Sequence, residues 1–99
     1  MGKDKQEPPP LDLDTVPEQY RSEVGELDHE IRTLRCHVDH IEPETGGIGW
    51  QAHWAPNEGR KTTYNVVTGS TPVAALRSAL IGARAYRDPA NNPPRFHLL

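Results

Sequence analysis

The sequence predicts an α+β fold, a two-layer sandwich in which a three-stranded antiparallel meander carries helices on one face. Two stretches of helical apolar spacing lie on either side of the middle of the chain. Between them lie three segments in which apolar and polar residues alternate, as in half-buried strands. Short turn sequences join these segments, which favours antiparallel pairing in the order α-β-β-β-α.

The first helix is expected to begin near Thr15, because Thr15-Val16-Pro17-Glu18 fits a capping box with proline in the first turn. Its apolar stripe has spacings of three and four residues and consists of Tyr20, Val24, Leu27, Ile31 and Leu34. The same spacing continues through Val38 and Ile41, so one interpretation is a single helix to Ile41. We favour a helix that ends near Arg32 and a strand over residues 34–41, because that stretch alternates with period two.

The second and third strands are expected at residues 48–55 and 60–68, separated by a turn that contains glycine. The last helix is capped at Thr71 or Ser70, has Pro72 in its first turn and ends at Arg87. We expect both helices to cover the sheet face that carries Trp50, Trp54 and Tyr64. The opposite face should then be polar.

Composition divides the chain into a disordered tail (1–13), one folded domain (14–87) and an irregular proline-rich tail (88–99). A core of this size is marginal, so self-association into a dimer stays open. The net charge is −3, which argues against a binder that depends on phosphate contacts. The single cysteine rules out an internal disulfide, and no apolar run is long enough to span a membrane. We therefore expect a cytoplasmic protein.

The element order is also that of double-stranded RNA-binding domains, which grip phosphates with lysines at the start of their last helix. Here residues 70–76 contain no basic residue, which argues against duplex RNA binding. Residues 38–86 more closely resemble the HicB-like antitoxin domain. The resemblance lies in Ile41-Glu42-Pro43-Glu44, Gly46-Gly47 and Trp50, and in Gly69-Ser70-Thr71-Pro72 followed by Ala75-Leu76. It implies a small bacterial or phage protein that masks a toxin, typically an RNA-cleaving one.

Cys36, His37, His40 and His53 are the residues whose types would suit a metal site. Strict strand alternation places Cys36 and His40 on one face and His37 on the other, which spoils a shared site. A weak adventitious site of His37, His53 and Asp39 on the polar face stays open, but we predict no functional metal site and no cofactor. Cys36 should be buried, where a thiol is usually inert, and no catalytic motif occurs elsewhere. The sequence therefore predicts no enzyme.

The residues expected to bind a partner form two groups. One is an exposed aliphatic residue between two arginines on the last helix, and the other lies on the polar sheet face: Arg77, Ile81, Arg84, His37, Asp39, Gln51 and His53. The leading hypothesis is a non-enzymatic inhibitor or antitoxin-like protein whose partner is a nuclease or a nucleic-acid-guided defence complex, as in an anti-CRISPR protein. The alternative is an RNA-binding module.

Overall fold

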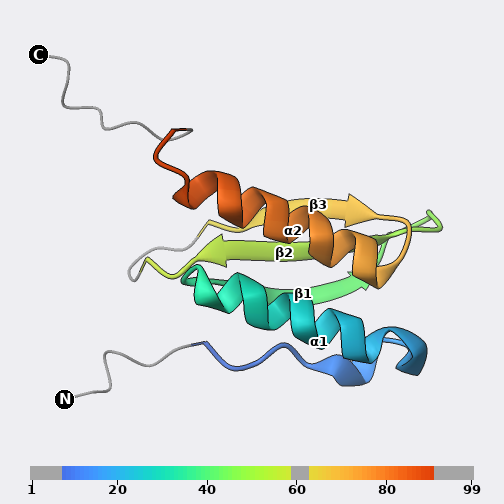
Figure 1. Ribbon diagram of the computed structural model, residues 1–99. Coiled ribbons are helices and arrows are strands. Elements are labelled where there is room, and N and C mark those ends of the chain that lie inside the picture. Colours follow the sequence, from blue (N-terminus) through green and yellow to red (C-terminus); the bar gives the residue numbers. More distant parts are fainter. Residues whose placement is uncertain (1–7, 59–62, 91–99) are drawn as a thin grey trace, which may run out of the picture.

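The computed structural model describes residues 8–58 and 63–90 and confirms the predicted fold class and element order (Figure 1). The elements are α1 (Glu18–Thr33), β1 (Cys36–Pro43), β2 (Trp50–Pro56), β3 (Asn65–Gly69) and α2 (Pro72–Arg87). The strands form one antiparallel sheet in the order β1-β2-β3. Both helices lie side by side on one face of this sheet, with α1 over β1 and α2 over β2 and β3.

The start of α1 differs from the predicted capping box. A short 3-10 helix, Leu13–Thr15, comes first, and Pro17 rather than Thr15 is the N-cap of α1, with no capping side-chain hydrogen bond. The Thr15 hydroxyl instead donates to the carbonyl of Asp12. By contrast, α2 begins as predicted: Thr71 is its N-cap, and the Thr71 hydroxyl oxygen accepts from the backbone N–H of Ala74 at 3.0 Å.

The boundary between α1 and β1 decides between the two interpretations of residues 34–41. Leu34 caps α1, and Arg35 has a φ of +56°, in the left-handed region that commonly ends a helix. The chain then turns back into β1. The predicted strand is therefore confirmed, and the single long helix is wrong.

The pairing of β1 with β2 contains one irregularity. Val38 lies opposite Trp54, but the next paired residue of β1 is His40, opposite His53, so Asp39 is an extra residue in the ladder. An extra residue reverses the alternation of side chains beyond it. As a result Ile41, not His40, follows Val38 on the helix-facing side, and Ile41 is buried while His40 is exposed.

The core lies between the sheet and the two helices. Val24 and Ile31 of α1 and Leu76 of α2 are fully buried against the helix-facing residues of the strands. Trp54 is 4% exposed and Trp50 is partly buried, as the prediction required. Burial of these apolar side chains supplies most of the favourable free energy of folding of a small domain.

Tyr64 was expected on the tryptophan side, and this expectation is wrong. Asn65 pairs with Trp54 and Val67 with Ala52, so these residues of β3 share the helix-facing side. Tyr64 and Val66 therefore project from the opposite face and are 38% and 52% exposed. The third strand was predicted to begin at Arg60; β3 begins at Asn65, and residues 60–62 lie outside the described part of the chain.

Part of the predicted N-terminal tail contacts the domain. Leu11 is buried in the core cluster, and the Arg32 guanidinium donates to the carbonyls of Pro8 and Pro9. Of the predicted C-terminal tail, Asp88 to Ala90 follow α2, and residues 91–99 lie outside the described residues. Within residues 8–58 and 63–90, none of the helices is both long and apolar enough to cross a membrane.

Candidate functional site

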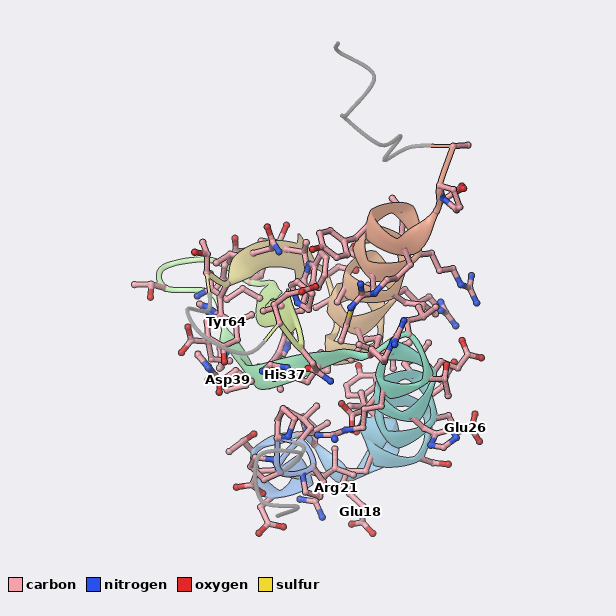
Figure 2. All side chains as sticks on the ribbon, turned by 90° about the vertical axis from the view of Figure 1, so that its left-hand side faces the viewer. Glu18, Arg21, Glu26, His37, Asp39 and Tyr64 are labelled. Carbon is pink, nitrogen blue, oxygen red and sulfur yellow. The ribbon has the colours of Figure 1, made fainter. Side chains whose placement is uncertain are left out.

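The sheet has one face that no described helix or strand covers, which we call the outer face (Figure 2). The pairing places His40, His53 and Val66 in one row across the three strands. Glu42, Gln51 and Thr68 form the next row. Polar side chains that lie far apart in the sequence thus meet on this face.

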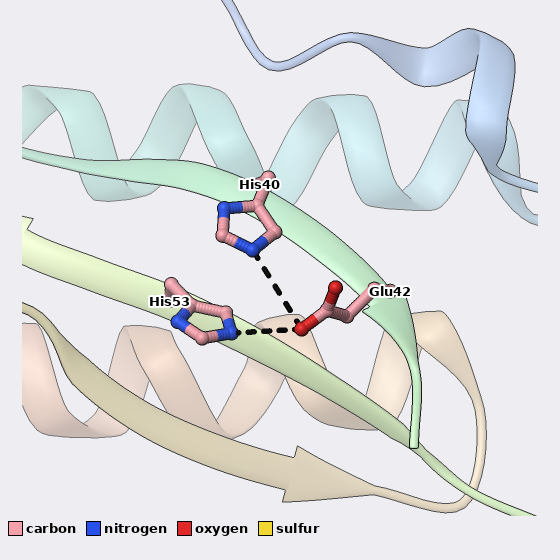
Figure 3. Close-up of side chains that lie close together, drawn as sticks. All are labelled: His40, Glu42 and His53. Atoms are coloured by element: carbon pink, nitrogen blue, oxygen red, sulfur yellow. Dashed lines mark hydrogen bonds and ion pairs between the residues drawn. The ribbon is translucent and has the colours of Figure 1, made fainter. Parts of the chain in front are cut away.

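The imidazoles of His40 and His53 face a single carboxylate oxygen of Glu42 (Figure 3). Glu42 Oε2 lies 3.2 Å from His53 Nε2 and 3.7 Å from His40 Nε2. The two imidazole rings are stacked, with centroids 4.1 Å apart. The Gln51 side-chain amide donates to the same oxygen at 2.6 Å.

The electrostatics of the cluster follow from these contacts. Hydrogen bonds from Gln51 and His53, with the smaller effect of the nearby imidazoles, lower the pKa of the Glu42 carboxyl. The other nitrogen of His40, Nδ1, lies 2.8 Å from the Asp39 carboxylate. Asp39 thus holds the His40 ring in an orientation in which its other nitrogen, Nε2, faces Glu42 Oε2.

Sequence reasoning missed the roles of His40 and Glu42. Strict alternation put His40 on the same side as Cys36, and this is wrong because of the extra residue Asp39. Glu42 was not among the residues expected to form a site, yet it lies within β1 opposite Gln51. A bulge leaves little signal in a single sequence, so the pattern of residues 36–43 alone could not show it.

His37, one of the residues expected to bind a partner, is only 6% exposed. Its Nδ1 lies 2.6 Å from Asn57 Oδ1, and its Nε2 lies 3.1 Å from the Tyr64 hydroxyl. These contacts tie β1 to the segments that flank β2 and β3. The structure therefore gives His37 a packing role, and the expectation of an accessible His37 is wrong.

The predicted arginine patch on α2 lies at the seam between the two helices. Ile81 is 66% exposed, as expected. Arg77 donates to Glu23 at 2.9 Å and Arg84 to Glu30 at 3.3 Å, so both arginines form ion pairs with α1. Arg87 donates to the backbone carbonyls of Leu34 and Arg35.

Exposed carboxylates lie on α1 and on the segment just before it. Among the described residues, the carboxylates of Asp12, Asp14, Glu18 and Glu26 are exposed and form no ion pair. Figure 2 shows Glu18 and Glu26 projecting outward from α1. We call these four residues the acidic surface.

A shallow hollow of about 480 Å³ lies between the sheet and the C-terminal half of α2. Tyr86 is the titratable side chain in its described lining, and its hydroxyl donates to Glu58, which raises the pKa of Tyr86. Cys36 is buried as predicted, and burial raises the pKa of its thiol. Neither feature pairs a nucleophile with a base.

Comparison of the chain with protein-family models, with curated proteins and with solved structures finds no match.

Proposed function

We propose that this chain is a non-enzymatic binding protein that masks a basic, nucleic-acid-binding surface of another protein. The chain would then be an inhibitor or antitoxin-like protein of bacterial or phage origin. Its partner would be a nuclease or a nucleic-acid-guided defence complex. The proposal rests on how the charges of the two helices are arranged.

The supporting observation is that the arginines of α2 form ion pairs within the described chain, whereas the four carboxylates of the acidic surface form none. α1 carries five carboxylates against two arginines, and α2 carries three arginines and no carboxylate. Two α1 carboxylates pair with Arg77 and Arg84, and Arg87 donates to backbone carbonyls and lies 3.5 Å from Glu58. The acidic surface remains free to meet positive charge.

Proteins that hold nucleic acids present lysine and arginine side chains to phosphates. Exposed carboxylates on α1 and on the segment before it are complementary to such a surface and would compete with the phosphates for it. Attraction between opposite charges also accelerates the encounter, most strongly at low ionic strength. Masking of this kind needs no reactive group.

The RNA-binding alternative is less well supported. It would use Arg77, Arg84 and Arg87 against phosphates, and each of them already donates to an acceptor in the chain. An RNA bound along α2 would also approach Glu23 and Glu30, which repel phosphates. Only the element order favours this alternative, and fold alone does not define function.

The test begins with capture of a protein from host lysate by the immobilised chain, followed by purification of the captured protein. Its dissociation constant is then measured for the wild type, for Glu26→Lys and for the matched control Glu44→Lys, which changes the net charge equally. Glu44 lies in the β1–β2 connection and is not one of the residues of the acidic surface. We expect Glu26→Lys to weaken binding about 10-fold or more, since one close charge pair is worth roughly 1.5 kcal/mol or more.

The control should change the affinity by less than about 3-fold, and the captured protein should lose nucleic-acid binding or cleavage in the presence of the chain. Equal weakening by both variants would mean that net charge alone drives the interaction. That outcome, or a captured protein whose nucleic-acid binding is unaffected, would contradict the proposal.

A further inference from the structure

We propose that His40, Glu42 and His53 form a binding site for one divalent cation of the zinc type on the outer face of the sheet. This inference is independent of the proposed function. It rests on the distances within the cluster, on the groups that orient its side chains and on the position of the bulge.

The distances suit a transition metal. One atom from each of the three side chains lies within 4.8 Å of the other two. Tetrahedral zinc, with bonds of about 2.0–2.1 Å, holds neighbouring ligand atoms roughly 3.3 Å apart. The separations of 3.2 Å and 3.7 Å from Glu42 Oε2 are already close to that value.

The cluster also has the outer groups that metal sites use to orient their ligands. Asp39 accepts from Nδ1 of His40 at 2.8 Å, which is the carboxylate–histidine arrangement that fixes the tautomer and raises the basicity of the ligating nitrogen. Asp39 is the bulged residue itself. One irregularity of β1 thus turns His40 towards His53 and supplies the carboxylate that orients it.

Binding requires two small movements. The His40 and His53 rings lie 19° from parallel, and they must tilt towards each other because each nitrogen lone pair lies in its ring plane. The side chain of His40 is 47% exposed, so its ring has room to turn. The Gln51 amide nitrogen lies 2.6 Å from Glu42 Oε2 and 3.4 Å from His53 Nε2, so the cation would displace this amide.

The donor set defines the class of cation. Two imidazoles and one carboxylate suit Zn²⁺ and its neighbours Co²⁺, Ni²⁺ and Cu²⁺, whereas Mg²⁺ and Ca²⁺ prefer oxygen ligands throughout. Three protein ligands leave a fourth position, which faces solvent and takes water. The cation would join β1 to β2 beyond the bulge.

The test is calorimetric titration of the untagged full chain with ZnCl₂. We expect saturable binding of one Zn²⁺ per chain and a rise of several degrees in the melting temperature at saturation, because the ligand binds the folded state. His40→Ala, His53→Ala and Glu42→Gln should each weaken binding at least about 10-fold. Asp39→Asn should weaken it roughly 10–100-fold, as for other residues that orient metal ligands.

Two matched variants sharpen the result. His29 is an exposed histidine of α1 outside the cluster, so His29→Ala should bind Zn²⁺ as the wild type does. Gln51→Ala removes the competing amide and should bind equally or more tightly. Circular dichroism of each variant without metal shows whether the fold persists, and a variant that unfolds is replaced by His40→Gln or His53→Gln.

Four outcomes would overturn the proposal. The first is an absence of saturable binding by the wild type at one cation per chain. The second is binding that survives in folded His40 and His53 variants, and the third is equal affinity for Mg²⁺. Loss of binding in His29→Ala but not in the cluster variants would place the cation elsewhere and overturn it as well.

Discussion

Arg35 shows at the scale of a single residue how this chain changes from helix to strand. Its φ of +56° places its backbone in the left-handed region. This conformation costs roughly 1–2 kcal/mol for a residue with a Cβ, because the Cβ comes too close to the following carbonyl oxygen. Its backbone carbonyl accepts hydrogen bonds from Asn57 and Arg87, which hold the turn in place. The hydrogen bonds to the backbone carbonyl of Arg35 stabilise the turn, whereas its Cβ destabilises the left-handed conformation that the turn requires.

Replacement of Arg35 by glycine should therefore stabilise the protein. Glycine adopts positive φ without a steric cost, and the backbone hydrogen bonds are kept. We expect Arg35→Gly to raise the free energy of unfolding by about 0.5–1 kcal/mol in urea denaturation. Arg35→Ala is the control, since it keeps the Cβ and should bring no gain. A destabilised Arg35→Gly variant would show that the arginine side chain itself supports the turn.

Residue-level expectations failed where local geometry departs from a regular strand. His40 and Tyr64 were both assigned to a sheet face by alternation, and both assignments were wrong. His40 lies on the outer face because Asp39 is an extra residue in β1. Tyr64 lies there because Asn65, the next residue, is the one that pairs with Trp54. Which strand face is buried depends on pairing between segments, and a single segment does not contain that information. The two tryptophans assigned to the helix-facing side of β2, Trp50 and Trp54, were placed correctly.

At the scale of elements, glycine decides how closely α2 approaches the sheet. A Cβ built at Gly82 would lie 2.7 Å from Cζ2 of Trp54, so α2 packs directly on the indole. A Cβ at Gly69 would lie 2.4 Å from the backbone nitrogen of Ala75, so the β3–α2 junction also requires glycine. The Gly69-Ser70-Thr71-Pro72 motif thus has a steric reason in addition to the Thr71 cap.

The glycines of the two helices provide a matched pair of substitutions. Gly82→Ala should destabilise the protein by about 1–3 kcal/mol, because Trp54 is buried and would have to move. Gly25→Ala in α1 should stabilise it by roughly 0.5–1 kcal/mol, since the nearest atom to its Cβ is Leu13 Cδ1 at 3.6 Å and alanine favours the helix. Thermal unfolding of both variants tests the packing of α2 on the sheet. Equal effects of the two changes would contradict it.

The elements themselves were largely predictable. Apolar spacing located both helices, and the Thr71 cap with Pro72 fixed the start of α2. The start of α1 was not predictable from the capping-box pattern, because Leu13–Thr15 forms a separate 3-10 helix that the buried Leu11 and Val16 anchor on either side. Tertiary burial there outweighs the local capping preference of Thr15.

At the scale of the whole molecule, charge is segregated between the two helices and partly neutralised where they meet. Arg77 and Arg84 reach across the seam to Glu23 and Glu30, and the acidic surface lies beyond it. The net charge of −3 indicated the sign of this field. The sequence could not show which arginines are paired, because the partners are 54 positions apart in both pairs.

The central functional claim is that the chain meets protein rather than nucleic acid, and an RNA titration tests it most directly. Fluorescence anisotropy is measured on a labelled RNA duplex of about 20 base pairs, longer than the roughly 16 that double-stranded RNA-binding domains span, and on a single strand of equal length, at about 50 mM salt. The account predicts no saturable binding of either RNA. Binding that weakens steeply with added salt and is lost in Arg77→Glu and Arg84→Glu would contradict it.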